Sequence, residues 1–123
     1  MSAAQPENNR SQPLSGITVL DLSHVYNGPY AAFLMALAGA TVIKIEPLHG
    51  EHLRSRGDLG GADLPFAMLN SNKKPVTLNL TAEKGRALFR ELVARADILV
   101  ENFAPGVMDR LGLGPKALHE INP

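Results

Sequence analysis

Short apolar runs alternate with polar turns and with segments of helical spacing along the chain. Residues 17–22 and 41–46 are β-branched and aliphatic runs, of the length expected for buried strands of a parallel sheet. Pro29 suits the start of a helix, so the apolar segment 29–38 predicts one, with Gly39 as its left-handed cap. Because this segment is apolar on nearly all faces, we expect the helix to pack between other elements. Strand, helix and strand then form a βαβ unit with a right-handed crossover.

The alternation continues after a long irregular segment. Residues 47–63 show no sustained period and indicate a loop, and loops of that length are usually functional. The elements predicted beyond it are, in order, a helical turn at 65–70, a strand at 76–80, an amphipathic helix at 82–94 with Thr81 as its N-cap, a strand at 97–101, and short helices at 107–111 and 115–121. This pattern predicts an α/β fold: a Rossmann-like, open, mainly parallel sheet with flanking helices.

The chain contains one predicted domain. Its first residues are polar and lack the apolar segment of a secretory signal, so we expect a disordered tail over residues 1–13. The domain itself spans residues 14–123. Because a strand would come next in the alternation of strands and helices, we expect this domain to be incomplete at its C-terminus.

Composition argues against several classes of function. Twelve Lys plus Arg balance twelve Asp plus Glu, which leaves no overall positive field for nucleic acid. The chain has no cysteine, which excludes disulfides and thiol nucleophiles. The most apolar stretch, residues 31–40, is about half the length that a membrane-spanning helix requires. We therefore expect a cytoplasmic protein without a nucleic-acid or membrane partner.

The sequence also lacks the motifs of tightly bound cofactors. Neither Gly-x-Gly-x-x-Gly nor the P-loop pattern Gly-x-x-x-x-Gly-Lys-Ser/Thr occurs, and no group of His, Asp and Glu has convincing metal-ligand spacing. The nucleophile elbow Gly-x-Ser-x-Gly is absent as well. We expect no permanently bound cofactor and no metal.

Two polar residues follow the last predicted strand, where ligands of open α/β sheets bind. Asn102 can both donate and accept, as a purine edge or a pantetheine amide requires, and Arg110 can bind a phosphate through its planar fork. Taken alone, each residue has a simpler explanation. Asn102 is suited to a turn, and Arg110 to a solvated or helix-capping position.

Other polar side chains have weaker cases. His24 follows the first strand, where a general base could stand, although a histidine that caps or lines the loop is the simpler explanation. The remaining candidates are expected to serve solvation or structure: Lys73, Lys74, Arg54, Arg56, Asp21 and Glu46.

The run ENFAPGVMDRLGLG at residues 101–114 is longer and more specific than either polar residue alone. It resembles the signature of the family III CoA-transferases, which include α-methylacyl-CoA racemases. Residues 13–22 and 28–46 are similar to the opening strand, first helix and second strand of that family, and residues 70–80 to its next segment. The resemblance covers residues 13–123 in order, without a large gap.

This resemblance implies a function. Members move CoA from an acyl-CoA thioester to a carboxylic acid through an aspartyl anhydride, so CoA is a substrate and not a permanent cofactor. The family's nucleophilic aspartate lies beyond the segment present here, and we assign no catalytic residue. Full-length members form interlocked homodimers. The positions that the family implies for CoA contact are Val25, Tyr26, Leu78, Asn79, Leu80, Thr81, Asn102, Phe103, Ala104 and Arg110.

The sequence departs from the family pattern at two positions, and two other functions are open. Pro47 stands where one branch of the family has an arginine that contacts CoA, and Tyr26 stands where that branch has glutamine, so the acyl pocket is expected to differ. One alternative is a racemase or isomerase of the same superfamily, which removes a proton next to the thioester. The other is a non-catalytic fragment that only binds CoA.

Overall fold

The computed structural model describes residues 11–55 and 64–123. Most of the predicted tail, residues 1–10, lies outside this part of the chain. The second half of the predicted long loop, with Arg56, lies outside it too.

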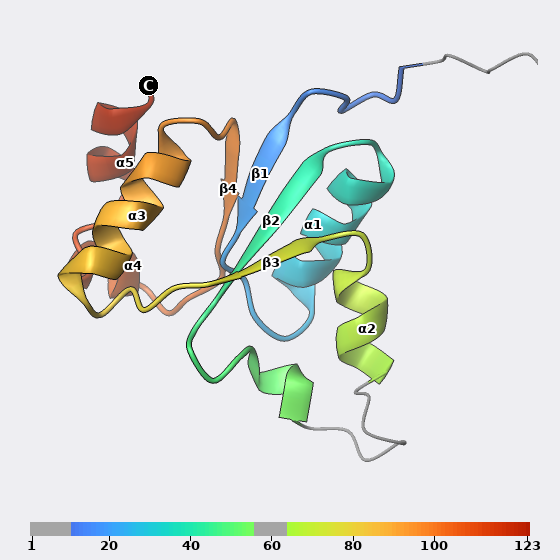
Figure 1. Cartoon of the computed structure of the whole chain (residues 1–123), viewed down its shortest axis with the longest axis horizontal. Helices are drawn as coiled ribbons and strands as arrows, with labels where there is room; N and C mark the ends of the chain where they lie inside the picture. The colour runs from blue at the N-terminus through green and yellow to red at the C-terminus, as the bar shows by residue number, and fades with distance from the viewer. Residues whose placement is uncertain (1–10, 56–63) are drawn as a thin grey trace, which may run out of the picture.

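Four parallel strands form one sheet in the order β3-β2-β1-β4 (Figure 1). Their bounds are Thr18–Asp21 for β1, Thr41–Glu46 for β2, Lys74–Thr77 for β3 and Ile98–Val100 for β4. In the register of the sheet, Val19 of β1 lies between Val42 of β2 and Ile98 of β4. This topology confirms the predicted α/β, Rossmann-like fold with an open parallel sheet.

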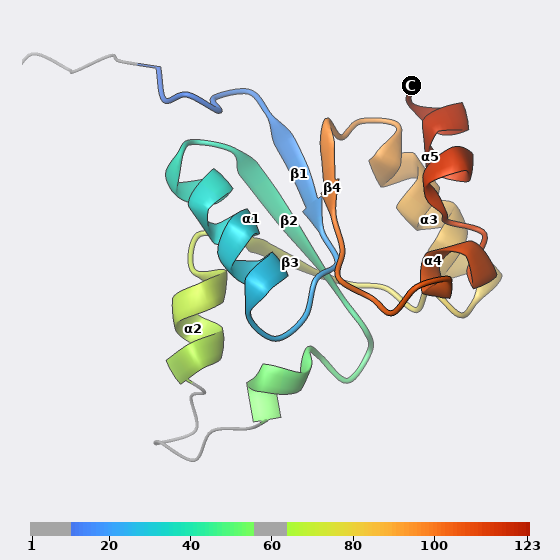
Figure 2. The same ribbon diagram turned by 180° about the vertical axis from the view of Figure 1, so that it is seen from behind.

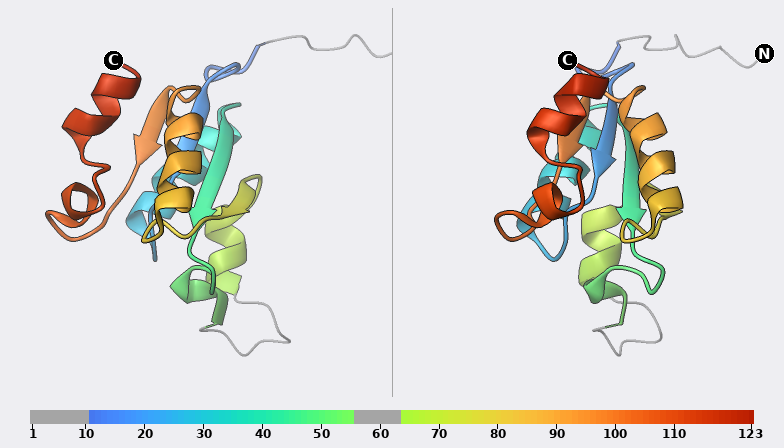
Figure 3. Two further views of the ribbon diagram at one scale, coloured as in Figure 1. Left: turned by 60° about the vertical axis from the view of Figure 1, so that its left-hand side comes forward. Right: turned by 90° about the vertical axis from the view of Figure 1, so that its left-hand side faces the viewer.

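Helices cover both faces of the sheet, as Figures 2 and 3 show. Helix α1 packs on one face, with α2 against α1, whereas α3, α4 and α5 belong to the other side. The helices are α1 at Asn27–Leu37, α2 at Leu64–Asn70, α3 at Glu83–Val93, α4 at Val107–Arg110 and α5 at Pro115–Ile121, and a 3-10 turn, η1, lies at His52–Ser55.

Side chains alternate along each strand, so the core consists of two clusters, one on each face of the sheet. Val19 and Val42 pack with Ala32 of α1, whereas Leu20 and Ile45 pack in a second cluster with Phe89 of α3. All six residues are buried. Successive side chains of a strand point to opposite faces, so a strand buried on both sides needs adjacent apolar residues, as the sequence pattern indicated; the buried charges Asp21, Lys44 and Glu46 lie toward the carboxyl ends of β1 and β2.

Two predicted boundaries are wrong. β3 begins at Lys74 rather than at residue 76, because Ile43 of β2 pairs with Lys74, and it ends at Thr77. The N-cap of α3 is Ala82, not Thr81, and no side chain caps this helix. The Thr81 hydroxyl donates to Asn79 Oδ1 at 2.6 Å, because residues 79–81 form a turn before the helix begins.

The outer face of α1 also differs from expectation. Tyr30, Leu34 and Leu37 are about half exposed, so this helix does not pack between elements on all sides within the described chain. Their spacing places them on one stripe of the helix. The sheet covers only the opposite face, where Ala32 is fully buried. Gly39, by contrast, has a positive φ of 101° and ends α1 as predicted.

Candidate functional site

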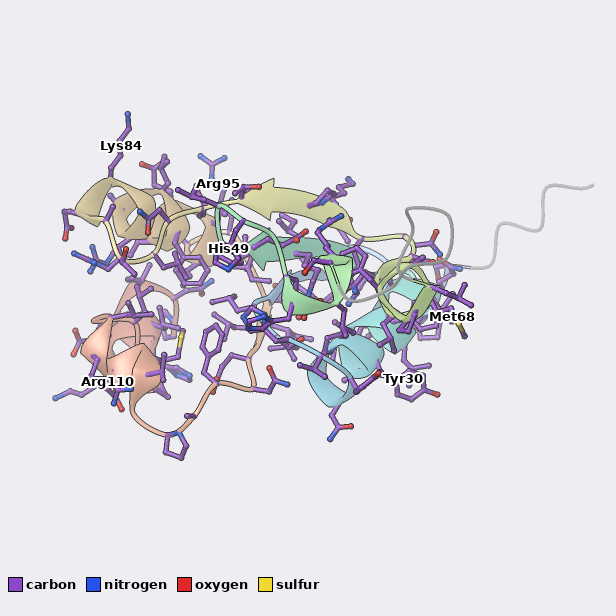
Figure 4. All side chains as sticks on the ribbon, turned by 90° about the horizontal axis from the view of Figure 1, so that it is seen from below. Tyr30, His49, Met68, Lys84, Arg95 and Arg110 are labelled. Carbon is purple, nitrogen blue, oxygen red and sulfur yellow. The ribbon has the colours of Figure 1, made fainter. Side chains whose placement is uncertain are left out.

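A groove lies at the carboxyl ends of β1 and β2, the edge of the sheet seen from below in Figure 4. Its volume is about 420 Å³. Its walls come from the strand ends, from the turn after β3, from the loop after β4 and from α4. Five of the ten residues implied for CoA contact line this one cavity: Leu78, Asn79, Leu80, Thr81 and Phe103.

The turn after β3 is held in place from α3. Arg86 Nη1 donates to the carbonyl oxygens of Leu80 at 3.2 Å and Thr81 at 2.9 Å. Asn79 Oδ1 accepts the Thr81 main-chain N–H at 3.0 Å. Gly85 lets this turn approach α3 closely, since a Cβ atom at that position would collide with the Asn79 carbonyl oxygen. The groove wall is therefore rigidly connected to the helix.

Asn102 binds the main chain of the turn after β1. Its Oδ1 accepts the His24 N–H and its Nδ2 donates to the His24 carbonyl oxygen, both at 2.8 Å. Asn102 does not line the groove. The structure thus gives Asn102 a role in holding a turn, and its contact with CoA stays a prediction.

The same turn contains strained backbone. Val25 has a φ of 68°, a left-handed conformation that is costly for a β-branched residue. The Val25 N–H donates to Glu51 Oε1 at 3.0 Å, and Lys44 Nζ donates to the Ser23 carbonyl oxygen at 2.8 Å. Strain of this kind persists only where the surroundings fix it, and such positions cluster at functional sites.

Beneath the turn lies a buried cluster of charges. The Lys73 ammonium group lies 2.7 Å from Asp21 Oδ2 and also donates to the Pro29 carbonyl oxygen and to Asn70 Oδ1, both at 2.9 Å. Its side chain is 1% exposed, so the expectation that Lys73 is a solvated surface residue is wrong. Lys44 Nζ lies 3.6 Å from the same Asp21 oxygen, and Asp21 also accepts hydrogen bonds from Ser23. Asp21 has a structural role, as expected.

A second ion pair anchors the segment after β2. Arg54 donates to both carboxylate oxygens of Glu46, at 2.6 and 2.7 Å, and its guanidinium group lies 4.0 Å from the ring centre of Phe66. Burial alone would raise the pKa of Glu46, but hydrogen bonds from Arg54 and from the Glu51 N–H outweigh it and hold that pKa below its usual value. Glu46 has a structural role, as expected, whereas Arg54, expected as a solvated charge, is held in this ion pair.

His24 lines the groove beside Phe103, with ring centres 5.2 Å apart. Its Nδ1 lies 3.9 Å from Glu51 Oε1. Burial lowers the pKa of His24, and the carboxylate of Glu51 opposes this shift only in part. Sequence reasoning did not select Glu51, because it lies in a segment without any regular pattern. Gly50 before it was a local signal of a turn in the sequence, and in the structure it has a φ of 83°.

The other implied contact residues lie around the groove and do not line it. Arg110 is an exposed residue of α4, one position before the groove residue Leu111, and Ala104 is exposed in the loop after β4. Figure 4 places Arg110 and Tyr30 on opposite sides of this edge of the sheet. Tyr26 is about half exposed at the start of α1.

A larger cavity, of about 730 Å³, lies elsewhere, between β4 and α5. Its walls include Leu99, Val100, Leu113 and Leu118. Within the described residues, β4 pairs only with β1, so this cavity follows the unpaired edge of the sheet. None of the ten implied contact residues lines it, which leaves the groove at the carboxyl ends as the candidate site.

Comparison with known proteins identifies the family. The model of CoA-transferase family III matches residues 14–123. The chain belongs to this family. A formyl-CoA:oxalate CoA-transferase of Streptomyces coelicolor is 46% identical over 115 residues, which are 92% of this chain and 28% of that protein. An acetyl-CoA:oxalate CoA-transferase of Acetobacter aceti is 47% identical over 113 residues, 90% of this chain and 29% of that protein.

Solved structures agree with this family III assignment. The chain matches a crystal structure of a point mutant of Rv3272 from Mycobacterium tuberculosis with a TM-score of 0.89 and 38% identity, over 92% of this chain and 31% of that one. A CAIB/BAIF family protein from Brucella suis matches with a TM-score of 0.86 and 36% identity, over 93% of this chain and 32% of that one. The chain thus spans less than a third of these relatives. In the described residues no helix is long and apolar enough to cross a membrane.

Proposed function

We propose that this chain forms the CoA-binding part of an enzyme that moves CoA from an acyl-CoA thioester to a carboxylic acid. The proposal rests on one observation, that residues implied for CoA contact from two separate segments line the same groove. Leu78, Asn79, Leu80 and Thr81 come from the turn after β3 and Phe103 from the loop after β4, yet all line one cavity at the carboxyl ends of the strands. Ligands of open α/β sheets bind at this edge.

The walls of the groove suit a molecule that is apolar in part and anionic in part. Leu78, Leu80 and Phe103 are partly exposed and offer an apolar surface to the adenine ring or to the pantetheine arm. Arg110 is exposed near the groove, one position before the groove residue Leu111, so a cation is available for a phosphate group. A groove of about 420 Å³ takes one portion of CoA, and the remainder would extend along the surface.

The chemical step requires a carboxylate that this chain does not supply. In the proposed reaction an aspartate attacks the thioester carbonyl, which forms a mixed anhydride and releases the CoA thiolate. The thiolate attacks the aspartyl carbonyl and displaces the donor acid, and the acceptor carboxylate then attacks the aspartyl thioester and releases the thiolate again. The thiolate finally attacks the acceptor's carbonyl in this second anhydride, which yields the new CoA thioester and frees the aspartate. No described aspartate lines the groove. The role of residues 14–123 is therefore to bind and orient CoA, and the rest of a cytoplasmic, homodimeric enzyme would supply the nucleophile.

Product analysis tests this proposal. The whole enzyme, which would supply the nucleophilic aspartate from outside residues 14–123, is incubated with formyl-CoA or acetyl-CoA and a set of carboxylic acids that includes oxalate, and the thioesters are identified by mass spectrometry. We expect a CoA thioester of one acceptor acid from the whole enzyme, whereas residues 14–123 alone should bind CoA without transfer. Deuterium exchange next to the thioester of a branched acyl-CoA in heavy water, without transfer, would instead support a racemase. Binding of CoA with neither reaction would support a non-catalytic fragment.

A further inference from the structure

Two buried polar atoms at the groove have no hydrogen-bond partner in the described part of the chain: His24 Nδ1 and Glu51 Oε2. The Glu51 side chain is only 1% exposed. Buried polar groups in folded proteins are nearly always paired, so two orphaned atoms on neighbouring side chains need an explanation. A carboxylate accepts hydrogen bonds, and an imidazole nitrogen donates one only when it carries a proton.

The position of Glu51 is fixed by its other contacts. Its Oε1 accepts the Val25 N–H at 3.0 Å, and its own N–H donates to Glu46 Oε2 at 3.1 Å. Glu46 is held in turn by the two hydrogen bonds from Arg54. Because the carboxylate cannot turn away without losing the strained Val25 turn, the variable part of this pair is the proton on His24.

Charges of both signs surround the His24 ring. Glu51 and Asp21 favour its protonated form, whereas Lys44, His52 and above all burial oppose it, and the balance lowers the pKa of His24. In the free protein at neutral pH the ring is therefore mostly neutral. A neutral imidazole has a single N–H, which can serve either Glu51 or a ligand in the groove.

We propose that His24 is a CoA-binding residue that takes up a proton from solvent when an anionic group of CoA enters the groove. This inference rests on the proposed function. The imidazolium ion has two N–H groups, so it can donate from Nδ1 to Glu51 and from Nε2 to the anion. A negative charge on each side of the ring favours the protonated form, as opposite charges near a titratable group do. The orphaned Nδ1 then acquires a partner in the bound state, once the ring closes its 3.9 Å separation from Glu51 Oε1.

Calorimetry of CoA binding at pH 7, in buffers of different ionisation enthalpy, measures the proton uptake. We expect uptake of up to about one proton for each CoA bound, since one histidine titrates in this range. The variants His24→Gln and Glu51→Gln should abolish or clearly reduce the uptake. Glu51→Gln keeps an acceptor for the Val25 N–H, so it tests charge and not the fold. His119→Gln, an exposed histidine outside the groove, is the matched control and should retain the uptake, and His49→Gln examines the other histidine of the groove.

Imidazole NMR gives a second readout that does not depend on a variant. The pKa of His24 should rise when CoA is added. Binding of CoA without proton uptake and without this rise would overturn the inference and leave the CoA site intact. Loss of uptake in His49→Gln but not in His24→Gln would overturn it as well. No binding of CoA would overturn the proposed function, and the inference with it.

Discussion

The side-chain amide of Asn102 closes two 2.8 Å hydrogen bonds on the main chain of His24, which lies 78 residues earlier in the chain. This pair ties the loop after β4 to the turn after β1. Glu51 holds the following residue, Val25, from the segment after β2. Two segments, one after β4 and one after β2, thus fix the short turn after β1 beside the groove.

Loss of the Asn102 amide should loosen this turn. We expect Asn102→Ala to lower the free energy of unfolding by about 1–2 kcal/mol, because two hydrogen bonds are lost and each contributes about 0.5–1.5 kcal/mol. CoA affinity should fall together with stability. Denaturant unfolding and calorimetry measure the two effects. If CoA affinity falls while stability is unchanged, Asn102 contacts CoA directly.

The buried cation Lys73 should contribute far more to stability than its neighbour Lys74. We expect Lys73→Met to destabilise the protein by about 3 kcal/mol, the lower end of the range for a broken buried pair, since Lys44 still faces Asp21. Lys74 is exposed, so Lys74→Met should change stability by less than about 0.5 kcal/mol. Equal effects of the two substitutions in urea unfolding would contradict the buried cluster.

Gly85 on α3 should be essential for the close packing of the groove wall against this helix. Gly→Ala in a helix normally stabilises by about 1 kcal/mol. At Gly85 the added methyl group would meet the Asn79 carbonyl oxygen, so we expect Gly85→Ala to destabilise by about 1–3 kcal/mol. The turn at residues 79–81 should move, with weaker CoA binding. Lys84→Ala on the same helix is the control, and stabilisation by Gly85→Ala would refute the close contact.

Acid stability should depend on the pair of Glu46 and Arg54. The pKa of Glu46 is lower in the folded protein than in the unfolded chain, so its contribution to stability is present above the unfolded value and is lost as pH falls through the folded one. Arg54→Leu removes the hydrogen bonds that lower this pKa, and burial then raises it. A raised pKa in the folded state reverses the linkage, so we expect the variant to be less stable than the wild type at pH 7 and this difference to shrink as pH falls through the range in which Glu46 is protonated. Unfolding measured from pH 7 to pH 3 provides the comparison, and identical profiles would rule out the proposed linkage.

The central strands β1 and β2 were predictable because adjacent apolar residues serve both faces of the sheet. Val19 and Leu20 are adjacent in sequence and pack on opposite sides of the core, which requires neighbouring apolar positions such as those within residues 17–22. The start of β3 was missed because it begins with Lys74 and Pro75, which are exposed, so no apolar pattern marked it. Local sequence also gave no reason to place Thr81 in a turn instead of at a helix cap.

The candidate site was only partly predictable from the sequence. The ENF run and the turn after β3 were identified through resemblance, and five of those residues line the groove. The buried roles of Lys73 and Glu51 were not foreseeable, because each depends on partners far away: Lys73 on Asp21, 52 residues earlier, and Glu51 on Val25, 26 residues earlier. Sequence spacing alone does not reveal such pairs.

CoA binding in the groove is the central claim, and titration of the isotope-labelled chain with CoA in two-dimensional NMR tests it most directly. We expect the amide signals of residues 78–81 and Phe103 to shift most. Arg110→Ala should weaken binding about tenfold, the equivalent of 1.4 kcal/mol, whereas Lys84→Ala should not. Shifts confined to the cavity between β4 and α5, or no shifts at all with millimolar CoA, would contradict the account.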